Sequence, residues 1–577
     1  MAYLFCANPS FFWLDSSELV AASWSLGVAH PPGHPLAVLI GRLFCYLPFG
    51  TIAFRVTLAS AFLAALSSGL VAALTQEWLK DLHKGEQGWP PRPWLSSLAA
   101  MVAGLTAGLS YTVFFQAVRA EVYALNVALI AACALLVLRW RARRDARFIL
   151  SAAFIAGLGL CNHHLLLLLA ALPALVFVII VAKKRQLLGK RGWVILLSFV
   201  LLGLAPFAHL PLRAQNHPQV NWGAPTTVER FAWVVSARAF QQSVERAGKE
   251  SLTHRAGGAV FAVFTGLTFF GGLLALAGFY FALRRRESRA PGALLGGVVL
   301  FNLVGPLLVG FDPFNPDAHG YLAVAVALLA PGIGVSIYVL AQVLAKQRPA
   351  FALVALIALA LPAHQLWQSW GQVNLRRHFA AEETGRALLH RPPRSVIFTA
   401  YYQSIFQAWA LQTSAGLRPD ITVVHLTFLL QPGYVESMSQ RHPELAGLLY
   451  RAKKARRLVL ADLAQLATER PVYLEPDEMV PPNVRRRLQP AGLLLRFGPP
   501  AATDTRRHWE RLTSWQNALE GHHDNETRRA ALWAHYRLAA WSCGSGHHSL
   551  GWRHLAQAMA LAPHARALEA LARRCGP

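Results

Sequence analysis

The sequence predicts a multispanning α-helical membrane protein, followed by a small α/β domain and a helical C-terminal region. Hydrophobic residues make up 54% of the 577 residues and charged residues only 15%, whereas soluble domains average about 25% charged. Long stretches without Asp, Glu, Lys or Arg recur, and basic residues cluster in the loops between them. This distribution excludes an ordinary soluble enzyme. It also explains the net charge of +26 without a nucleic-acid partner.

The first 50 residues do not contain a complete membrane span. The residues before Asp15 are too few to cross a bilayer, and they lack the basic start and apolar core of a signal peptide. We therefore expect residues 1–50 to form a truncated first helix, or one whose start is placed late, and an outer loop.

Residues 51–370 form the predicted transmembrane core. A spanning helix needs roughly 20 apolar residues. The stretches free of charged residues are 56–76, 94–118, 122–138, 148–182, 192–212, 256–283, 290–311, 318–345 and 349–375. The stretch 148–182 is too long for one crossing, and basic loops flank both of its ends. Because basic loops stay in the cytoplasm, we expect this stretch to fold back at Asn162-His163-His164. Ten spans result, and everything after about residue 371 lies outside.

The C-terminal third has a different composition. Short apolar runs alternate with helical stretches over 371–504, which predicts an extracytoplasmic α/β domain. Residues 505–577 have helical spacing, and the stretch from Leu532 to Ala562 resembles one TPR-like unit, although such arrays usually need three or more. Cys543 and Cys575 either form a disulfide or remain free thiols.

An acidic pair and a proline-rich turn stand out near the N-terminus. Asp15 and Glu18 have the i,i+3 spacing that places two side chains on one helix face. A capping box, with Asp15 opening the helix, explains the same spacing. The segment His30-Pro31-Pro32-Gly33-His34-Pro35 cannot continue a helix. A stiff turn explains its prolines but not its two histidines.

Four segments together resemble the DUF2723 family of protein O-mannosyltransferase-like membrane proteins. They are 12–35, Arg119-Ala-Glu121-Val-Tyr123-Ala-Leu-Asn126, Gly157-Leu-Gly-Leu-Cys-Asn162-His163-His164, and Leu210-Pro-Leu-Arg213 with Asn221-Trp222-Gly223. The resemblance implies a GT-C fold and a glycosyltransferase that moves a sugar, expected to be mannose, from a polyprenyl-phosphate donor. The acceptor is expected to be a hydroxyl on the extracytoplasmic face, of Ser or Thr in a protein or of a glycan.

We assign hypothetical roles for this reaction. Asp15 is the candidate base, and Glu18 orients Asp15 or the sugar. Arg213, and second Arg119, is the candidate partner of the lipid phosphate, because a planar guanidinium matches phosphate oxygens. The remaining candidate substrate-binding residues are His30, His34, Glu121, Tyr123, Asn126, His163, His164, Asn221 and Trp222.

Structural alternatives stand beside these roles. They are a snorkelling Arg213, an Arg119–Glu121 ion pair and a polar helix turn at His163-His164. We expect no metal ion and no cofactor beyond the lipid-linked donor. The expected surroundings are the lipid bilayer, as a multi-pass protein of a bacterial inner membrane. A lipid-linked sugar transporter or flippase and a non-catalytic scaffold remain alternative functions.

Overall fold

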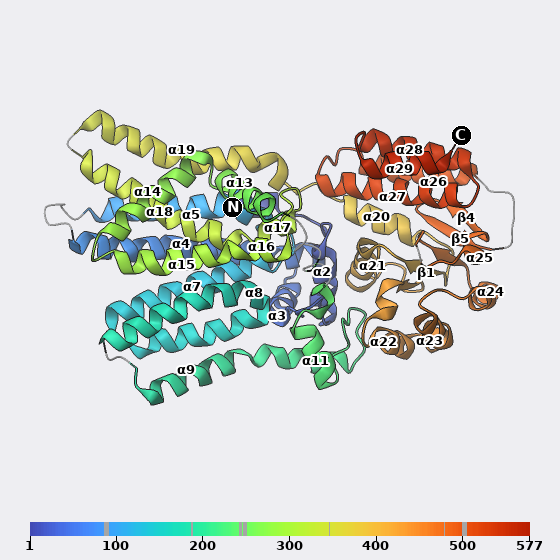
Figure 1. Cartoon of the computed structure of the whole chain (residues 1–577), viewed down its shortest axis with the longest axis horizontal. Helices are drawn as coiled ribbons and strands as arrows, with labels where there is room; N and C mark the ends of the chain where they lie inside the picture. Colours follow the sequence, from blue (N-terminus) through green and yellow to red (C-terminus); the bar gives the residue numbers. More distant parts are fainter. Residues whose placement is uncertain are drawn as a thin grey trace.

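The computed structural model describes residues 1–85, 92–185, 188–241, 245, 251–345, 347–477, 479–498 and 505–576. A bundle of long helices occupies one end of the molecule, and a mixed α/β and helical part occupies the other (Figure 1). The predicted boundary at residue 504 lies outside the described residues.

Seven helical segments in the described chain are long and apolar enough to cross a membrane, and two bent pairs could each add one span. The seven segments are built from α4 (Ile52–Gly85), α7 (Tyr123–Arg143), α8 (Ala146–Arg185), α9 (Lys190–Gly203) with α10 (His209–Ala214), α15 (Arg289–Asn302) with α16 (Val304–Val309), α18 (Ala323–Val343) and α19 (Arg348–Val373). The bent pairs are α5 (Pro93–Leu109) with α6 (Tyr111–Ala117), and α13 (Leu252–Gly266) with α14 (Phe269–Arg284). The protein is therefore an integral, multi-pass membrane protein.

The predicted fold-back lies within α8. Its backbone leaves the helical conformation at His163, where φ is −140° and ψ is 88°. The Asn162 side-chain amide donates to the carbonyl of Val122, just before α7, whereas Arg185 donates to the carbonyl of Arg141, near the end of α7. The two halves of α8 therefore run in opposite directions beside α7, which confirms the reversal. Counting α8 as two crossings raises the nine candidates to the ten that were predicted.

Glycine permits a close contact between two of these helices. A β-carbon on Gly278 of α14 would lie only 1.9 Å from the carbonyl oxygen of Gly332 in α18. Small residues allow helix backbones to approach one another in a membrane, where packing replaces the hydrophobic effect as the driving force.

The N-terminal segment lies between the bundle and the C-terminal part (Figure 1). It contains the short α1 (Ala2–Cys6), then α2 (Asp15–Ser25) and α3 (Pro35–Cys45). Proline at the first position of α3 is favourable because that position needs no backbone N–H donor. Two further short helices, α11 (Val228–Val235) and α17 (Pro316–Gly320), lie in the loops that connect spans.

The predicted α/β domain is confirmed. Its mixed sheet has the strand order β2-β1-β3-β5-β4, in which β1, β2 and β3 are parallel and β5 runs antiparallel to both neighbours. The strands are β1 (Val396–Thr399), β2 (Thr422–His425), β3 (Val472–Leu474), β4 (Leu488–Ala491) and β5 (Leu494–Phe497). The helices are α20 (Ala380–Leu389), α21 (Tyr402–Ser414), α22 (Tyr434–Arg441), α23 (Ala446–Ala455), α24 (Leu460–Glu469) and α25 (Pro482–Arg485). Strand β4 contains Gln489 and Pro490, and as an edge strand it tolerates a proline.

The C-terminal region is helical, as predicted, with α26 (Thr505–Leu519), α27 (Asn525–Gly544), α28 (His548–Leu561) and α29 (Arg566–Cys575). A disulfide joins Cys543 and Cys575. Trp515 donates a 2.9 Å hydrogen bond to Thr384 of α20, so this region packs directly on the α/β domain. Its TPR-like character stays a prediction.

Candidate active site

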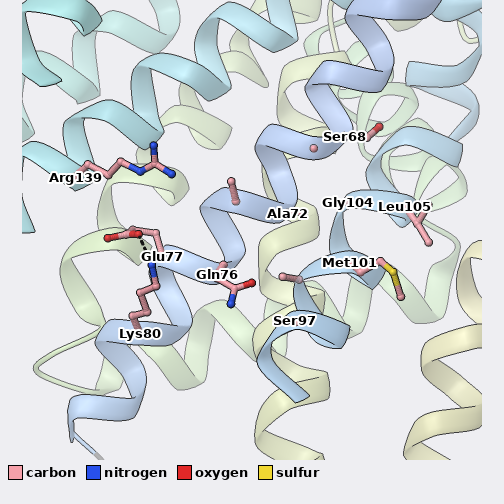
Figure 2. Close-up of a pocket in the computed structure, with 13 residues that line it drawn as sticks. Ser68, Ala72, Gln76, Glu77, Lys80, Ser97, Met101, Gly104, Leu105 and Arg139 are labelled. Carbon is pink, nitrogen blue, oxygen red and sulfur yellow. Dashed lines mark hydrogen bonds and ion pairs between the residues drawn. The ribbon is translucent and has the colours of Figure 1, made fainter. Parts of the chain in front are cut away.

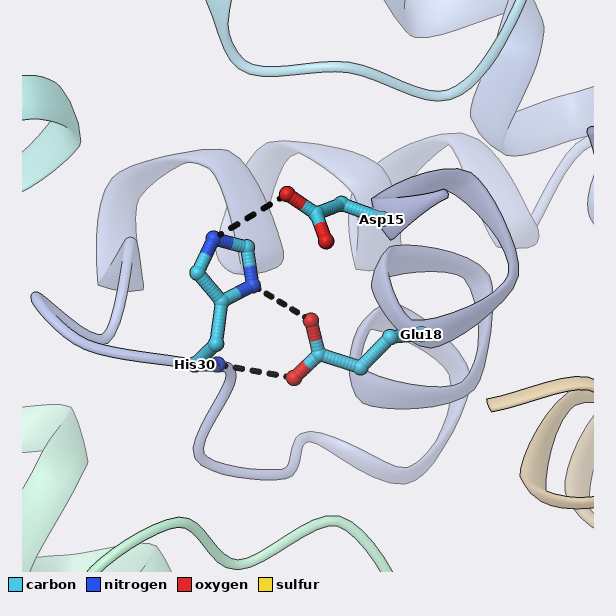
Figure 3. Close-up of side chains that lie close together, drawn as sticks. All are labelled: Asp15, Glu18 and His30. Carbon is cyan, nitrogen blue, oxygen red and sulfur yellow. Dashed lines mark hydrogen bonds and ion pairs between the residues drawn. The ribbon is translucent and has the colours of Figure 1, made fainter. Parts of the chain in front are cut away.

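Asp15, Glu18 and His30 converge at the start of α2 (Figure 3). The Nδ1 atom of His30 lies 2.5 Å from Glu18 Oε2, and its Nε2 atom lies 3.6 Å from Asp15 Oδ2. The backbone N–H of His30 also donates to the other oxygen of Glu18, at 2.7 Å. The Glu18 carboxylate is fully buried, whereas the Asp15 side chain remains 32% exposed. Of the two carboxylates, Asp15 is therefore the one that a substrate can reach.

A capping box does not account for the i,i+3 spacing of Asp15 and Glu18. The residue that precedes α2 is Leu14, and no side-chain hydrogen bond caps this end of the helix in the described chain. Glu18 instead reaches across to the turn that carries His30, because α2 directs it toward the interior. The two carboxylates on one face thus hold the proline-rich turn against α2.

Charge complementarity determines the protonation of this cluster. Burial alone would lower the pKa of His30, but the carboxylates of Asp15 and Glu18 raise that pKa to about 10. Burial raises the pKa of Asp15 to about 6, although the positive charge of His30 opposes the rise. At neutral pH, His30 is therefore an imidazolium, and Asp15 is a carboxylate of raised basicity.

His34 completes the cluster as a neutral ring. Its Nδ1 donates to the carbonyl of Asn162 at 2.5 Å, and its Nε2 lies 3.2 Å from Nε2 of His30. Burial lowers the pKa of His34 well below its ordinary value, and the neighbouring charge of His30 adds to the effect. The unprotonated Nε2 therefore accepts a hydrogen bond from the imidazolium, which holds the His30 ring in place.

Arg119 lies in a second, adjoining cluster. Its guanidinium lies 2.9 Å from Glu121 and 2.5 Å from Asp317, and it donates to Gln116 at 2.9 Å. It is completely buried and lies over the rings of Phe12 and Phe115. The ion-pair alternative for Arg119 is thus confirmed, with Asp317 as an additional partner. Two carboxylates pair with this cation, and its role as a phosphate partner stays a prediction.

Arg213 does not reach the cluster. It donates to the backbone carbonyls of Ser25 and Leu26, at 3.1 and 3.0 Å. These carbonyls lie at the C-terminal end of α2, about 16 Å from Asp15 along an 11-residue helix. The role of Arg213 as partner of the lipid phosphate stays a prediction, because the structure shows only where its guanidinium donates. A cation at this end satisfies the free carbonyls and the negative end of the helix dipole.

Several other predicted residues gather beside His34. The His163 ring lies 5.9 Å from His34, 5.6 Å from Tyr123 and 5.4 Å from Tyr321. Asn126 is fully buried, and neither polar atom of its side chain has a hydrogen-bond partner among the described residues. His164 follows His163 in the chain, and its Nδ1 atom has no hydrogen-bond partner among the described residues.

Asn221 and Trp222 connect the cluster to the α/β domain. Asn221 donates to Ser437 at 3.2 Å and shares a β-bridge with Val28. The ring of Trp222 lies 6.4 Å from His30 and 4.5 Å from Phe428. Both residues therefore shape the wall of the site.

The sequence did not point to Gln403, which contacts the chain directly before Asp15. Gln403, in the first turn of α21, accepts a 2.8 Å hydrogen bond from the backbone of Leu14. No local signal marks Gln403, because its partner lies 389 residues earlier in the chain.

The donor atoms of Asp15, Glu18 and His30 lie within 4.8 Å of one another, a spacing that could hold a metal ion. However, an imidazolium offers no lone pair, so His30 would first have to lose the proton that Glu18 stabilises. The absence of a metal stays a prediction.

A separate cavity of about 450 Å³ lies between α4 and α5 (Figure 2). It is lined by Glu77, which pairs with Lys80 at 3.1 Å, and by Arg139 near the basic end of α7. Its residues come from the half of the bundle opposite Asp15, so it is not part of the candidate site.

Residues 15–188 match the family described as the Protein O-mannosyl-transferase TMEM260 N-terminal domain. This match confirms the family resemblance. The mouse protein O-mannosyl-transferase TMEM260 is 29% identical over 223 residues, which are 38% of this chain and 29% of the relative. The Dictyostelium discoideum relative of the same name is 23% identical over 246 residues, which are 40% of this chain and 28% of the relative. The matched region thus spans less than a third of either relative.

The fold of this chain is similar to solved structures of ArnT from Cupriavidus metallidurans. The structure bound to undecaprenyl phosphate superposes with a TM-score of 0.53 at 12% identity, covering 82% of this chain and 91% of ArnT. The apo structure gives a TM-score of 0.51 at 13% identity, with the same coverage. The predicted GT-C fold is therefore confirmed.

Proposed function

We propose that the protein is a membrane glycosyltransferase that moves mannose from a polyprenyl-phosphate donor to an acceptor hydroxyl on the extracytoplasmic face. The observation that carries the proposal is the partly exposed Asp15 carboxylate, held beside the His30 imidazolium. The names of the matched relatives support the reaction type, and undecaprenyl phosphate bound to ArnT supports a lipid-linked donor.

Asp15 acts as the general base in this proposal. It removes the proton from the acceptor hydroxyl as the hydroxyl oxygen attacks the anomeric carbon. The bond between that carbon and the phosphate oxygen breaks, and the lipid phosphate leaves with the electron pair. A positioned base contributes about 10²- to 10⁴-fold, and a pKa of about 6 suits catalysis near neutral pH.

His30 takes the role that Arg213 was expected to have. It is a cation in direct contact with Asp15, and it stabilises negative charge on the departing phosphate. Glu18 contacts Nδ1 of the His30 imidazolium and His34 contacts its Nε2. The charged ring is therefore already oriented, and it needs to move little during the reaction.

Two features support an extracytoplasmic site. The α/β part lies at one end of the molecule, whereas α8 ends and α9 begins, within a basic loop, at the far end of the bundle (Figure 1). Basic loops favour the cytoplasm. The Cys543–Cys575 disulfide is also typical of an oxidising compartment, such as a bacterial periplasm.

The test is Asp15→Asn, which keeps the size of the side chain and removes the base. Transfer from radiolabelled polyprenyl-phosphate mannose should fall at least about a hundredfold, while expression and donor binding persist. Asp145→Asn is the matched control, because Asp145 pairs locally with Arg147 in the loop between α7 and α8.

Full activity of Asp15→Asn would remove Asp15 from the mechanism. Donor translocation without any transfer by the unmodified protein would instead favour the transporter alternative.

A further inference from the structure

The cavity of about 450 Å³ between α4 and α5 is a groove at the surface of the membrane bundle (Figure 2). Small residues line it on both helices, among them Gly69, Ala72 and Gly104, together with the larger Met101 and Leu105. The side chains of Met101 and Leu105 are 49% and 44% exposed, so the groove is open on its outer side. Because the bundle crosses a membrane, this open side faces lipid.

The groove has about the length of one membrane leaflet. Its lining on α4 runs from Ser68, at the middle of that helix, to Lys80, near its end. Twelve residues of helix span about 18 Å. One leaflet contributes half of the hydrocarbon core, about 15 Å. A lipid chain in the groove therefore extends from the level of Lys80 to the middle of the bilayer.

The charged residues of the groove gather at one end. Glu77 and Lys80 lie in the last turns of α4, and Arg139 lies in the last turn of α7. Both helices lead into basic loops at this end, and the positive-inside rule assigns such loops to the cytoplasm. The groove is thus amphipathic along its length, with charges at the level of the lipid head groups and small or apolar residues toward the bilayer centre.

Arg139 is the cation that lacks a partner at this end. Glu77 pairs with Lys80 at 3.1 Å, and Arg141 pairs with Asp81 at 2.6 Å. Within the described chain Arg139 makes no ion pair, and its Nε atom has no hydrogen-bond partner. Figure 2 shows the Arg139 side chain extending from α7 toward α4. Two cations and one carboxylate leave a net positive charge in the groove, which an anion complements.

Snorkelling alone does not explain this arrangement. A snorkelling side chain packs its stem on apolar surface and keeps its charged head in water. Lys80, whose side chain is 55% exposed, fits that description. Arg139 is instead half-buried at the groove, where its donors await an acceptor.

We propose that the groove binds an anionic glycerophospholipid of the cytoplasmic leaflet, such as phosphatidylglycerol. Its phosphate lies at Arg139 and Lys80, and one acyl chain lies along Gly69. Guanidinium donors match phosphate oxygens, and basic pockets between membrane helices on the cytoplasmic side bind anionic head groups. The groove is in the half of the bundle opposite Asp15, so this lipid is neither donor nor acceptor in the proposed transfer.

Gly69 allows the groove to be tested separately from its charge. A β-carbon at Gly69 would meet no atom within 4 Å, so the side chain of Gly69→Leu projects into the groove and not into packed protein. Leucine also favours a helix more than glycine does. Gly257→Leu is the matched control, because Gly257 of α13 is equally open and does not line the groove.

The test is native mass spectrometry of the full chain in detergent, titrated with phosphatidylglycerol. Phosphatidylglycerol should bind more tightly than phosphatidylcholine with the same acyl chains. Its affinity should fall about fivefold in Arg139→Gln, the size of effect expected for one basic residue at a membrane surface. Gly69→Leu should weaken binding at least as much. Arg191→Gln removes an exposed cation from α9, outside the groove, and should leave the affinity unchanged.

Three results would overturn the inference. They are equal binding of phosphatidylglycerol and phosphatidylcholine, equal affinities in Arg139→Gln and Arg191→Gln, and equal affinities in Gly69→Leu and Gly257→Leu. Tighter binding of polyprenyl phosphate than of phosphatidylglycerol would also overturn it and would assign the groove to a prenyl lipid.

Thermal unfolding shows which variants are folded, and either Arg139→Gln or Gly69→Leu is decisive by itself. Lys80→Gln, at an exposed position, is a third variant that should also weaken phosphatidylglycerol binding. No measurement here involves sugar transfer, so the outcome is separate from the test on Asp15.

Discussion

The backbone N–H of Leu14 donates a 2.8 Å hydrogen bond to the side-chain oxygen of Gln403. Leu14 has φ 61° and ψ −140°, a conformation that residues other than glycine rarely adopt. The neighbouring Trp13 donates to Thr527 of α27 at 2.9 Å. The α/β domain and the C-terminal helices thus hold the chain where it enters α2, and so they determine the direction of Asp15.

Gln403→Leu should lower kcat about tenfold or more, because a misplaced base loses the alignment that transfer requires. The pH at which the rate falls should not change, because the surroundings of the Asp15 carboxylate remain. Gln403→Glu keeps an oxygen acceptor and should restore most of the rate. Steady-state assays measure both, and Gln465→Leu, at an exposed position of α24, is the control. An unchanged kcat in Gln403→Leu would show that Gln403 has no positioning role.

The rate of transfer should fall as the pH drops below about 6. The base must be a carboxylate, and burial raises the pKa of Asp15 to about 6, so protonation removes the active form as the pH falls through that value. Initial rates between pH 5 and pH 8 measure this limb, with donor binding followed in parallel. A rate that does not fall between pH 7 and pH 5 would mean that the carboxylate has an ordinary pKa.

Three buried histidines should make the C-terminal helices unstable in acid. His508, His535 and His554 form a row with nitrogen distances of 3.0 and 3.1 Å. Burial lowers their pKa values to about 4, 4 and 2, respectively. In the unfolded chain these histidines have pKa values near 6.5 and take up protons that the buried rings do not bind. The folded protein therefore loses stability as the pH drops below about 6.5.

The expected loss is up to about 1.4 kcal/mol per pH unit for each histidine. Thermal unfolding at pH 7, 6 and 5 measures it. His508→Phe should make the dependence on pH shallower by about one proton. A melting temperature that does not change between pH 7 and pH 5 would contradict this prediction.

Loss of the disulfide should destabilise the same helices. Cys543 and Cys575 are 32 residues apart, and a crosslink over that distance stabilises by about 3–4 kcal/mol in the chain-entropy model. The double variant Cys543→Ser/Cys575→Ser should therefore unfold at a lower denaturant concentration. Reductant should lower the stability of the unmodified protein and leave the variant unchanged. Equal stability with and without reductant would show that the bond contributes little.

The sequence alone determined the features that depend on nearby residues. Apolar runs and basic loops predicted the spans and the reversal of α8, because membrane insertion responds to local composition. The i,i+3 spacing of Asp15 and Glu18 and the rigid turn at His30 likewise pointed to the cluster, because all three residues lie within a short segment.

Only the tertiary structure decided which distant groups meet. Arg119 pairs with Asp317, 198 residues away, and Gln403 pairs with Leu14, 389 residues away. Arg213 donates to the carbonyls of Ser25 and Leu26 at the C-terminal end of α2, and no pattern near residue 213 in the sequence shows that these are its partners. Side-chain partners across a fold are selected by the packing of whole helices, and no local pattern encodes that packing.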